Sequence, residues 1–383
     1  MVSRILLLLC FISPKRVFWV LGNRDINKLR MTQELGLPTS IATTSSVAAR
    51  VPYHPGLTWF RGSGRVGDPD GTLPSMIPGE RLKWILGNTM GSPDAFDHRK
   101  QELFWETTGC REENSRCINR EKVDNVISDE DVVRSYQESC HPRGEMGRFL
   151  AEGLLAVKVG PILCVHGSLP LTKDVMTEAK QDQSIWDDMT FCMPWINKTH
   201  HDYANDHQYS TASDFGVKTI EDWLEVLNNF SADNIEAWKH HTEQLETEYK
   251  KERQGEYDNF TDRQKEESKN SIWAYRAGYG NGPSYSGIYY SDLVQYGMGM
   301  IPGGKKNPTV VYNSFTPEGM PTSFLQTVEK RGDIRDNNPG IGSQESSESD
   351  VARCTREFLE QSTIRLILTG HKPQVIFSVG LTL

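Results

Sequence analysis

The sequence predicts an α/β fold with polar residues grouped at the ends of buried strands. Three short apolar runs, at residues 17–21, 162–165 and 364–369, each lead into a glycine with polar neighbours. Short apolar runs bounded by glycine or proline are typical of buried strands. The segments between them contain stretches with helical periodicity and helix-capping residues. This alternation of buried strands and helices indicates the α/β class.

The first apolar run leads directly into the polar block Gly22-Asn23-Arg24-Asp25. Gly22 permits a sharp turn at which a side chain would clash. The three polar residues then lie just beyond the carboxyl end of the strand, where open α/β sheets build their sites. A polar turn without function would leave the same pattern, and spacing alone favours that interpretation.

Helices are expected after this block and through the loop-rich insertion at residues 37–140. A helix at 26–35 ends at Gly36, and its N-terminus would face the polar block, where backbone N–H groups favour an anion. The other predicted helices in and after the insertion cover residues 80–86, 100–105, 128–136 and 145–153. The third of these opens with Ser128 and Asp131 in the spacing of a capping box.

The second and third strands each end beside a histidine. Residues 154–158 and 162–165 predict a hairpin that delivers His166, and the last strand delivers His371. A single histidine after a strand is usually a hydrogen-bonding residue. Three strand ends that deliver Asn23, His166 and His371 in order favour a site, because imidazole nitrogens and an amide oxygen suit borderline divalent metals.

Residues 170–305 form a predicted helical insertion. One amphipathic helix begins at Thr219 and buries Trp223, and a second is expected around Trp238. The neighbouring histidines 240–241 do not face one another on a helix, so they are not interpreted as a metal pair.

The remaining expectations concern the C-terminal part of the chain. Residues 309–312 predict a strand, after which Asn313 would lie near the site. Residues 331–349 are interpreted as a linker, and residues 350–360 as a helix.

The amino-acid composition indicates the cellular compartment and the kinds of partner to expect. The chain has 383 residues, a net charge of −9 and 37% hydrophobic residues, which is typical of a globular protein with a substantial core. The acidic balance argues against a nucleic-acid partner. The seven cysteines include no C-x-x-C pair, which favours a reducing compartment, here the cytoplasm.

The N-terminus leaves two interpretations open. Arg4 followed by the apolar residues 5–12 resembles a short signal sequence, although no small-residue cleavage site follows. The run is far shorter than the ~20 apolar residues that span a bilayer, so no membrane span is expected. The alternative is a truncated helix that packs on the sheet before the first strand.

Together these blocks resemble those of calcineurin-like metallophosphoesterases. Residues 22–25 resemble the GNH[ED] block, in the variant GNRD, of a eukaryotic and algal branch of that family. Val165-His166-Gly167 resembles the later HG block, and Gly370-His371-Lys372-Pro373 resembles the terminal GH block. Their order and strand contexts match over roughly residues 5–375.

The resemblance implies one domain over residues 1–383, built as a two-sheet sandwich flanked by helices. It also implies metal-dependent hydrolysis of a phosphate ester, with two ions of manganese, iron or zinc ~3.5–4 Å apart and a phosphorylated substrate. Asn23, His166 and His371 would be metal ligands. Arg24 replaces a catalytic histidine of the family; it stays charged and would clamp phosphate. Asp25 would orient Arg24 or carry a proton.

Two blocks of the family are absent from this chain. Residues 1–21 contain no Asp, Glu or His, so the family's D-x-H and GDxxD blocks, which supply half of its ligands, are missing. Any metal is therefore expected to be weakly held. One interpretation is an enzyme sequence that is incomplete at both ends. The alternative is a catalytically inactive relative that binds a phosphorylated partner or acts as a scaffold.

Overall fold

The computed structural model describes eleven stretches of the chain: residues 17–35, 78–109, 120–170, 216–253, 292–297, 299–301, 305–306, 309–315, 321, 355 and 359–371. The chain divides into two compact units. Unit 1 comprises Met1–Arg4, Asn27–Phe149 and Ala237–Tyr289; unit 2 comprises Ile5–Ile26, Leu150–Glu236 and Tyr290–Leu383.

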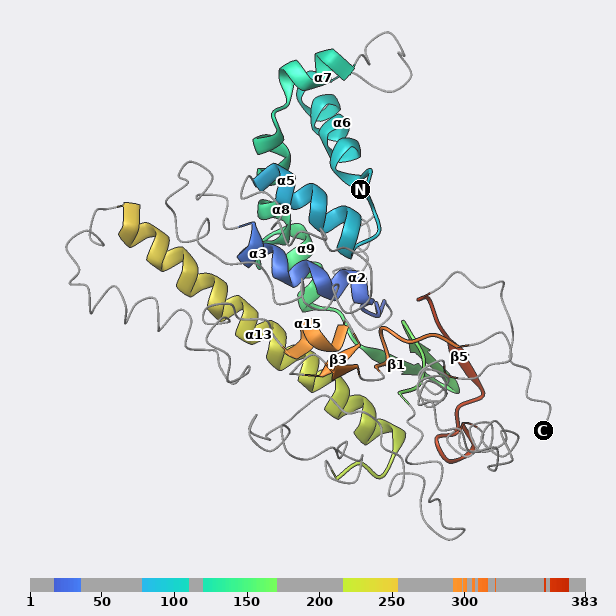
Figure 1. Cartoon of the computed structure of the whole chain (residues 1–383). Helices are drawn as coiled ribbons and strands as arrows, with labels where there is room; N and C mark the ends of the chain where they lie inside the picture. Colours follow the sequence, from blue (N-terminus) through green and yellow to red (C-terminus); the bar gives the residue numbers. More distant parts are fainter. Residues whose placement is uncertain are drawn as a thin grey trace, which may run out of the picture. The chain divides into compact units, whose positions relative to one another are not determined.

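The described part of unit 1 is helical (Figure 1). Its elements are η1 (Asn27–Arg30), α3 (Met31–Glu34), α5 (Pro78–Trp84), η4 (Ile85–Thr89), α6 (Ala95–Thr108), α7 (Arg120–Val126), α8 (Asp129–Cys140), the start of α9 (Glu145–Ala151) and the second part of α13 (Ile220–Arg253). Apolar side chains from these helices form one buried core, which includes Met31, Leu82, Phe96, Val132 and Cys140. The predicted helices at 80–86, 100–105, 128–136 and 145–153 are thus confirmed.

The start of α8 has the predicted capping box. The Ser128 hydroxyl accepts a hydrogen bond from the Asp131 N–H at 3.2 Å, and the Asp131 carboxylate accepts one from the Ser128 N–H at 3.0 Å. Two backbone donors that the helix leaves without a partner are thereby satisfied. The Ser128 hydroxyl also donates to the Asp131 carboxylate at 2.7 Å, and this hydrogen bond, together with the one from the Ser128 N–H, holds the pKa of Asp131 below its ordinary value.

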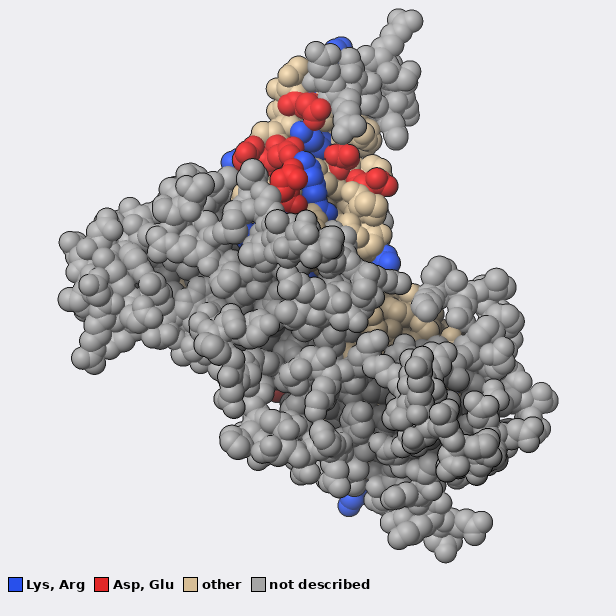
Figure 2. All heavy atoms as spheres, in the orientation of Figure 1, with Lys and Arg blue, Asp and Glu red and all other residues tan. Residues whose placement is uncertain are grey.

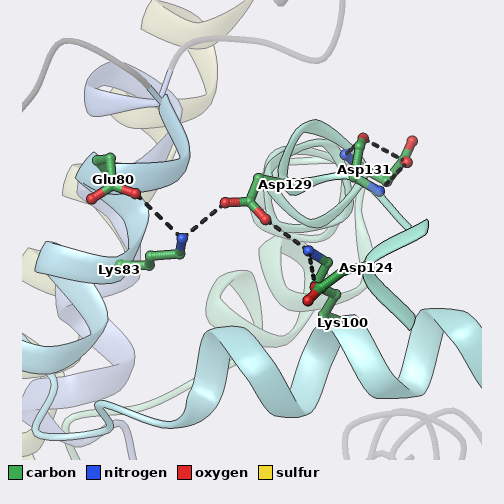
Figure 3. Close-up of polar contacts among 7 residues, drawn as sticks. Glu80, Lys83, Lys100, Asp124, Asp129 and Asp131 are labelled. Atoms are coloured by element: carbon green, nitrogen blue, oxygen red, sulfur yellow. Dashed lines mark hydrogen bonds and ion pairs between the residues drawn. The ribbon is translucent and has the colours of Figure 1, made fainter. Parts of the chain in front are cut away.

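Ion pairs connect α5, α6, α7 and α8 in unit 1. Asp129 of α8 accepts hydrogen bonds from Lys83 of α5 at 2.8 Å and from Lys100 of α6 at 3.0 Å. Glu80 and Asp124 bind the same two lysines from the outer sides (Figure 3). Figure 2 shows acidic and basic side chains interspersed over this surface. We interpret this network as a structural clamp between α5, α6 and α8.

Unit 2 contains a small mixed sheet, so the chain is broadly α/β. Strands β1 (Ala156–Val159) and β2 (Ile162–Val165) form the predicted antiparallel hairpin, and Gly160 closes it with a φ of 57°. Strand β5 (Leu366–Leu368) pairs with β2 in parallel, which gives the order β1-β2-β5. A second pair consists of β3 (Met300–Ile301) and β4 (Lys305–Lys306).

The described helices of unit 2 are α2 (Asn23–Ile26), α15 (Asp292–Gly297) and the first part of α13 (Ile220–Arg253). Helix α13 is attached to β1: the Asn228 amide accepts from the Leu155 N–H at 2.9 Å and donates to the Ala156 carbonyl at 3.0 Å. The prediction of two helices in this region is wrong. One uninterrupted helix forms because no glycine or proline occurs between residues 220 and 253.

The other two strand predictions have different outcomes. Residues 17–21 contribute one parallel bridge, between Val20 and Leu154, rather than a full strand. The prediction of a strand at residues 309–312 is wrong, because the chain turns there. The Thr309 hydroxyl accepts from the Tyr312 N–H at 3.1 Å, and the Asn313 side chain accepts from the Thr309 N–H at 2.9 Å. Side-chain acceptors of this kind offer the backbone an alternative to a sheet ladder.

Some expectations lie outside the described residues: the N-terminal apolar segment, the linker at 331–349 and most of the helix at 350–360. In the part of the chain that is described, no helix combines the length and the apolar character needed to cross a membrane.

Candidate functional site

His166 and His371 come together at one edge of the sheet in unit 2. Parallel pairing of β2 with β5 places the carboxyl ends of both strands at the same edge. His166 directly follows β2, and the Gly370 N–H donates to the His166 carbonyl at 2.9 Å. The Nε2 atom of His166 then lies 3.3 Å from the Nδ1 atom of His371. The two rings meet edge to face at 82°, with their centroids 5.2 Å apart.

Gly22 packs directly against the His166 ring. A Cβ atom added to Gly22 would lie 2.7 Å from Cε1 and 2.8 Å from Nδ1 of His166. Such distances are too short for non-bonded carbon and nitrogen, so any larger residue would force the ring or the turn to move. The position of this glycine thus brings the polar block of residues 22–25 to the histidine pair, as the sequence predicts.

Asp25 closes the turn that begins α2. Its carboxylate accepts a hydrogen bond from the Gly22 N–H at 3.0 Å, and the Gly22 carbonyl accepts from the Asp25 and Ile26 N–H groups. The helix therefore starts at Asn23 rather than at residue 26. The sequence placed a free helix N-terminus here as an anion site. That expectation stays a prediction, because the hydrogen bond from Gly22 to Asp25 involves the residue before the helix and not the N–H groups of its first turn.

Charges beside the pair act on His166. Burial lowers the pKa of the His166 imidazole below its ordinary value, the Asp25 carboxylate acts to raise that pKa, and Arg24 acts to lower it. The net effect favours the neutral imidazole, which is the form that binds metals. Arg24 is exposed, whereas Asn23 is half-buried on the first turn of α2.

A turn that the sequence did not identify lies against the same edge. The Gly167 N–H donates to the Val310 carbonyl at 2.6 Å, and a Cβ on Gly167 would meet the Asn313 carbonyl oxygen at 2.5 Å. This confirms the expectation that Asn313 lies near the site. The turn also presents Tyr312, whose ring centroid is 5.8 Å from that of His371. The apolar run at 309–312 concealed this residue because it resembles a strand.

The histidine pair fits one metal ion. Two imidazole nitrogens bound at about 2.0–2.1 Å to a tetrahedral zinc ion are about 3.3 Å apart. The observed separation of 3.3 Å therefore suits a shared ion as well as a hydrogen bond. Within the described ranges, no group of three or more His, Cys, Asp or Glu side chains is placed to hold an ion. A two-metal centre would need ligands beyond those the structure describes.

The chain matches no known family model, no curated protein and no solved structure in any of the three comparisons. The function is therefore argued from the site itself. The site combines a histidine pair, an exposed arginine and an aromatic ring at one sheet edge.

Proposed function

We propose that this chain is a calcineurin-like phosphoesterase that hydrolyses a phosphate ester with the help of a divalent metal. The observation that carries the proposal is the 3.3 Å approach of His166 and His371 at the ends of two parallel strands, with the block of residues 22–25 beside them. This is the arrangement that the order of the three sequence blocks predicts. In this proposal, the strands β1, β2 and β5 belong to one sheet of a two-sheet sandwich, and the protein is cytoplasmic.

The donor set indicates how metal would be held. Nε2 of His166 and Nδ1 of His371 would bind one ion of manganese, iron or zinc, with the Asn23 amide oxygen as a further ligand. Such an ion supplies a Lewis acid and a bound water that ionises near neutral pH. With few protein ligands, the affinity of this chain for the ion is low.

The other residues of the block have supporting roles. Arg24 is a permanently charged donor that can bind two oxygens of a phosphate group at once. Asp25 holds the turn at Gly22 and thereby fixes the position of the His166 ring. Asp25 is therefore a positioning residue in this proposal, whereas the sequence suggested that it orients Arg24 or carries a proton.

One observation favours a second candidate function. Among the residues that the structure describes, no third His, Cys, Asp or Glu side chain is placed to hold a metal ion together with the histidine pair. A site with two imidazoles and an arginine can bind a phosphorylated partner without hydrolysing its phosphate ester. This alternative is a catalytically inactive, calcineurin-like binding protein.

Hydrolysis of p-nitrophenyl phosphate by the purified chain, with and without added manganese, tests the proposal. We expect manganese-dependent hydrolysis that His166→Ala and His371→Ala abolish. His240→Ala, which removes an exposed histidine elsewhere, should retain it. Phosphate binding that needs His166 but gives no turnover would establish the inactive binding protein. Hydrolysis that both site variants retain would refute the proposal.

A further inference from the structure

Tyr312 is the exposed residue of an otherwise buried turn. Its neighbours Thr309, Val310, Val311, Asn313 and Ser314 are all buried, whereas the Tyr312 side chain is 41% exposed. Single exposed aromatic residues are common on protein surfaces. This one differs because its ring lies 5.8 Å from the ring of His371, at a tilt of 48°. The exposed ring therefore borders the histidine pair.

The turn holds the Tyr312 ring in place before any ligand binds. The Tyr312 N–H is bound by the Thr309 hydroxyl at 3.1 Å, and the Val310 N–H donates to the Tyr296 hydroxyl at 3.2 Å. The ring also packs against the backbone of Gly299, where a Cβ atom would overlap it. A ring fixed in this way loses little conformational entropy when a second ring packs on it.

We propose that Tyr312 determines specificity by packing against a planar ring in the leaving group, so that the substrates are aryl phosphates. This inference rests on the proposed function, which puts the phosphate at His166 and His371. In an aryl phosphate one oxygen joins the ring to phosphorus, so the ring lies within a few ångströms of the phosphate. Aromatic rings attract one another at centroid separations of about 4.5–7 Å. The base of a nucleotide lies several bonds farther from its phosphate and would extend past Tyr312.

Calorimetric titration of the full chain, with zinc present, tests this with phosphonates that cannot be hydrolysed. Phenylphosphonate and cyclohexylphosphonate carry the same anionic group and have similar apolar size, but only the first has a planar aromatic ring. We expect the wild type to bind phenylphosphonate about 3- to 10-fold more tightly. Tyr312→Phe should keep this preference, and Tyr312→Leu should remove it. Phe18→Leu removes another exposed aromatic side chain and should leave the preference unchanged.

Two further measurements make the test more specific. A short peptide carrying phosphonomethyl-phenylalanine tests whether the substrate is phosphotyrosine in a protein or a small aryl phosphate. Tighter binding of this peptide than of phenylphosphonate identifies phosphotyrosine in proteins. Equal binding of the two identifies small aryl phosphates. A nuclear Overhauser effect between the phenyl protons and the Tyr312 ring in the wild type tests the contact without any substitution. This measurement keeps the inference falsifiable even if Tyr312→Leu fails to fold.

The possible failures are distinguishable. Equal binding of the two phosphonates by the wild type, or a preference that survives Tyr312→Leu, overturns the inference and leaves the proposed function in place. Tighter binding of a nucleoside monophosphate than of phenylphosphonate also overturns it. If the wild type binds no phosphonate, both the inference and the proposed function fail.

Discussion

The Nε2 atom of His166 lies 3.3 Å from the Nδ1 atom of His371, although 205 positions separate the two residues in the sequence. The contact depends on the register of β2 and β5, in which Cys164 is paired with Leu368. A shift of one residue would move every side chain of β5 to the other face of the sheet. The site is thus a product of strand pairing.

Gly22→Ala should disturb the site by direct overlap. The added Cβ atom would lie 2.7–2.9 Å from three atoms of the His166 ring, so the ring or the turn must move. We expect a loss of about 1–3 kcal/mol in the free energy of unfolding. Metal binding should fall with it. Denaturant unfolding and metal titration of the same variant measure both effects.

Gly370→Ala is the matched control for this change. Its Cβ atom would lie 3.7 Å from Nδ1 of His166, which is an ordinary contact distance. The hydrogen bond from the Gly370 N–H to the His166 carbonyl is also retained. Equal losses in the two variants would contradict the account of Gly22, since they would show that overlap with the ring is not the cause.

Asn228→Ala should loosen α13 from the sheet of unit 2. The Asn228 amide bonds to the backbone of Leu155 and Ala156, and both of these residues are buried. Buried backbone groups left without partners cost about 1–3 kcal/mol. Denaturant unfolding should therefore show a loss of that size. Asn229→Ala, at the exposed neighbouring position, should change stability by less than about 0.5 kcal/mol.

Local patterns in the sequence were enough to predict the hairpin that carries His166, the capping box at Ser128 and the strand before His371. Each depends on residues within a few positions of one another. The meeting of the two histidines also followed from the sequence, because parallel strands end at the same edge of a sheet.

Other features were not predicted, either because the partner is distant in the sequence or because the same local residues allow two different conformations. Two helices were expected where the single helix α13 forms, and the Asn228 amide of this helix bonds to β1. Side-chain acceptors on Thr309 and Asn313 convert an apolar run into a turn. The role of Asp25 at Gly22 was likewise hidden, since an acidic residue in a polar block suits both catalysis and capping.

Asp129→Asn should weaken the clamp between the helices of unit 1. Burial acts to raise the pKa of Asp129, but its hydrogen bonds with Lys83 and Lys100 outweigh this and lower the pKa below its ordinary value. Because the folded-state pKa is depressed, this stabilisation is present above about pH 4 and is lost at lower pH. Hydrogen bonds to charged groups contribute about 1.5–3 kcal/mol, and partial exposure should place the loss near the lower end.

Thermal unfolding of Asp129→Asn between pH 3 and pH 7, beside Glu130→Gln, measures this effect. Glu130 is exposed on the same first turn of α8. Its variant should retain nearly wild-type stability at pH 7. A loss for Asp129→Asn that persists unchanged at pH 3 would show that the cause is not the ionised carboxylate.

His241→Leu should reduce the loss in the free energy of unfolding that occurs as the pH falls. Burial, aided by the charge of His240, lowers the pKa of His241 to about 4. The unfolded chain therefore takes up the proton first, and stability falls as the pH drops from about 6.5 to about 4. The contribution is on the order of 3 kcal/mol for a shift of this size.

Denaturant unfolding across this pH range compares His241→Leu with His240→Gln. Only His241→Leu should reduce the slope of the free energy of unfolding against pH. The slope should fall without vanishing, because burial also lowers the pKa of His141. A full wild-type slope in His241→Leu would contradict the assignment.

Calorimetric titration of the purified chain with zinc tests the central claim that the His166–His371 pair binds a divalent metal. The account predicts one weakly bound ion per chain, lost in His166→Ala and in His371→Ala and retained in His240→Ala. Since ligand stabilisation disappears below the dissociation constant, a chelator should hardly change the unfolding temperature of the chain as purified. Two tightly held ions, or one that survives both site substitutions, would contradict the account.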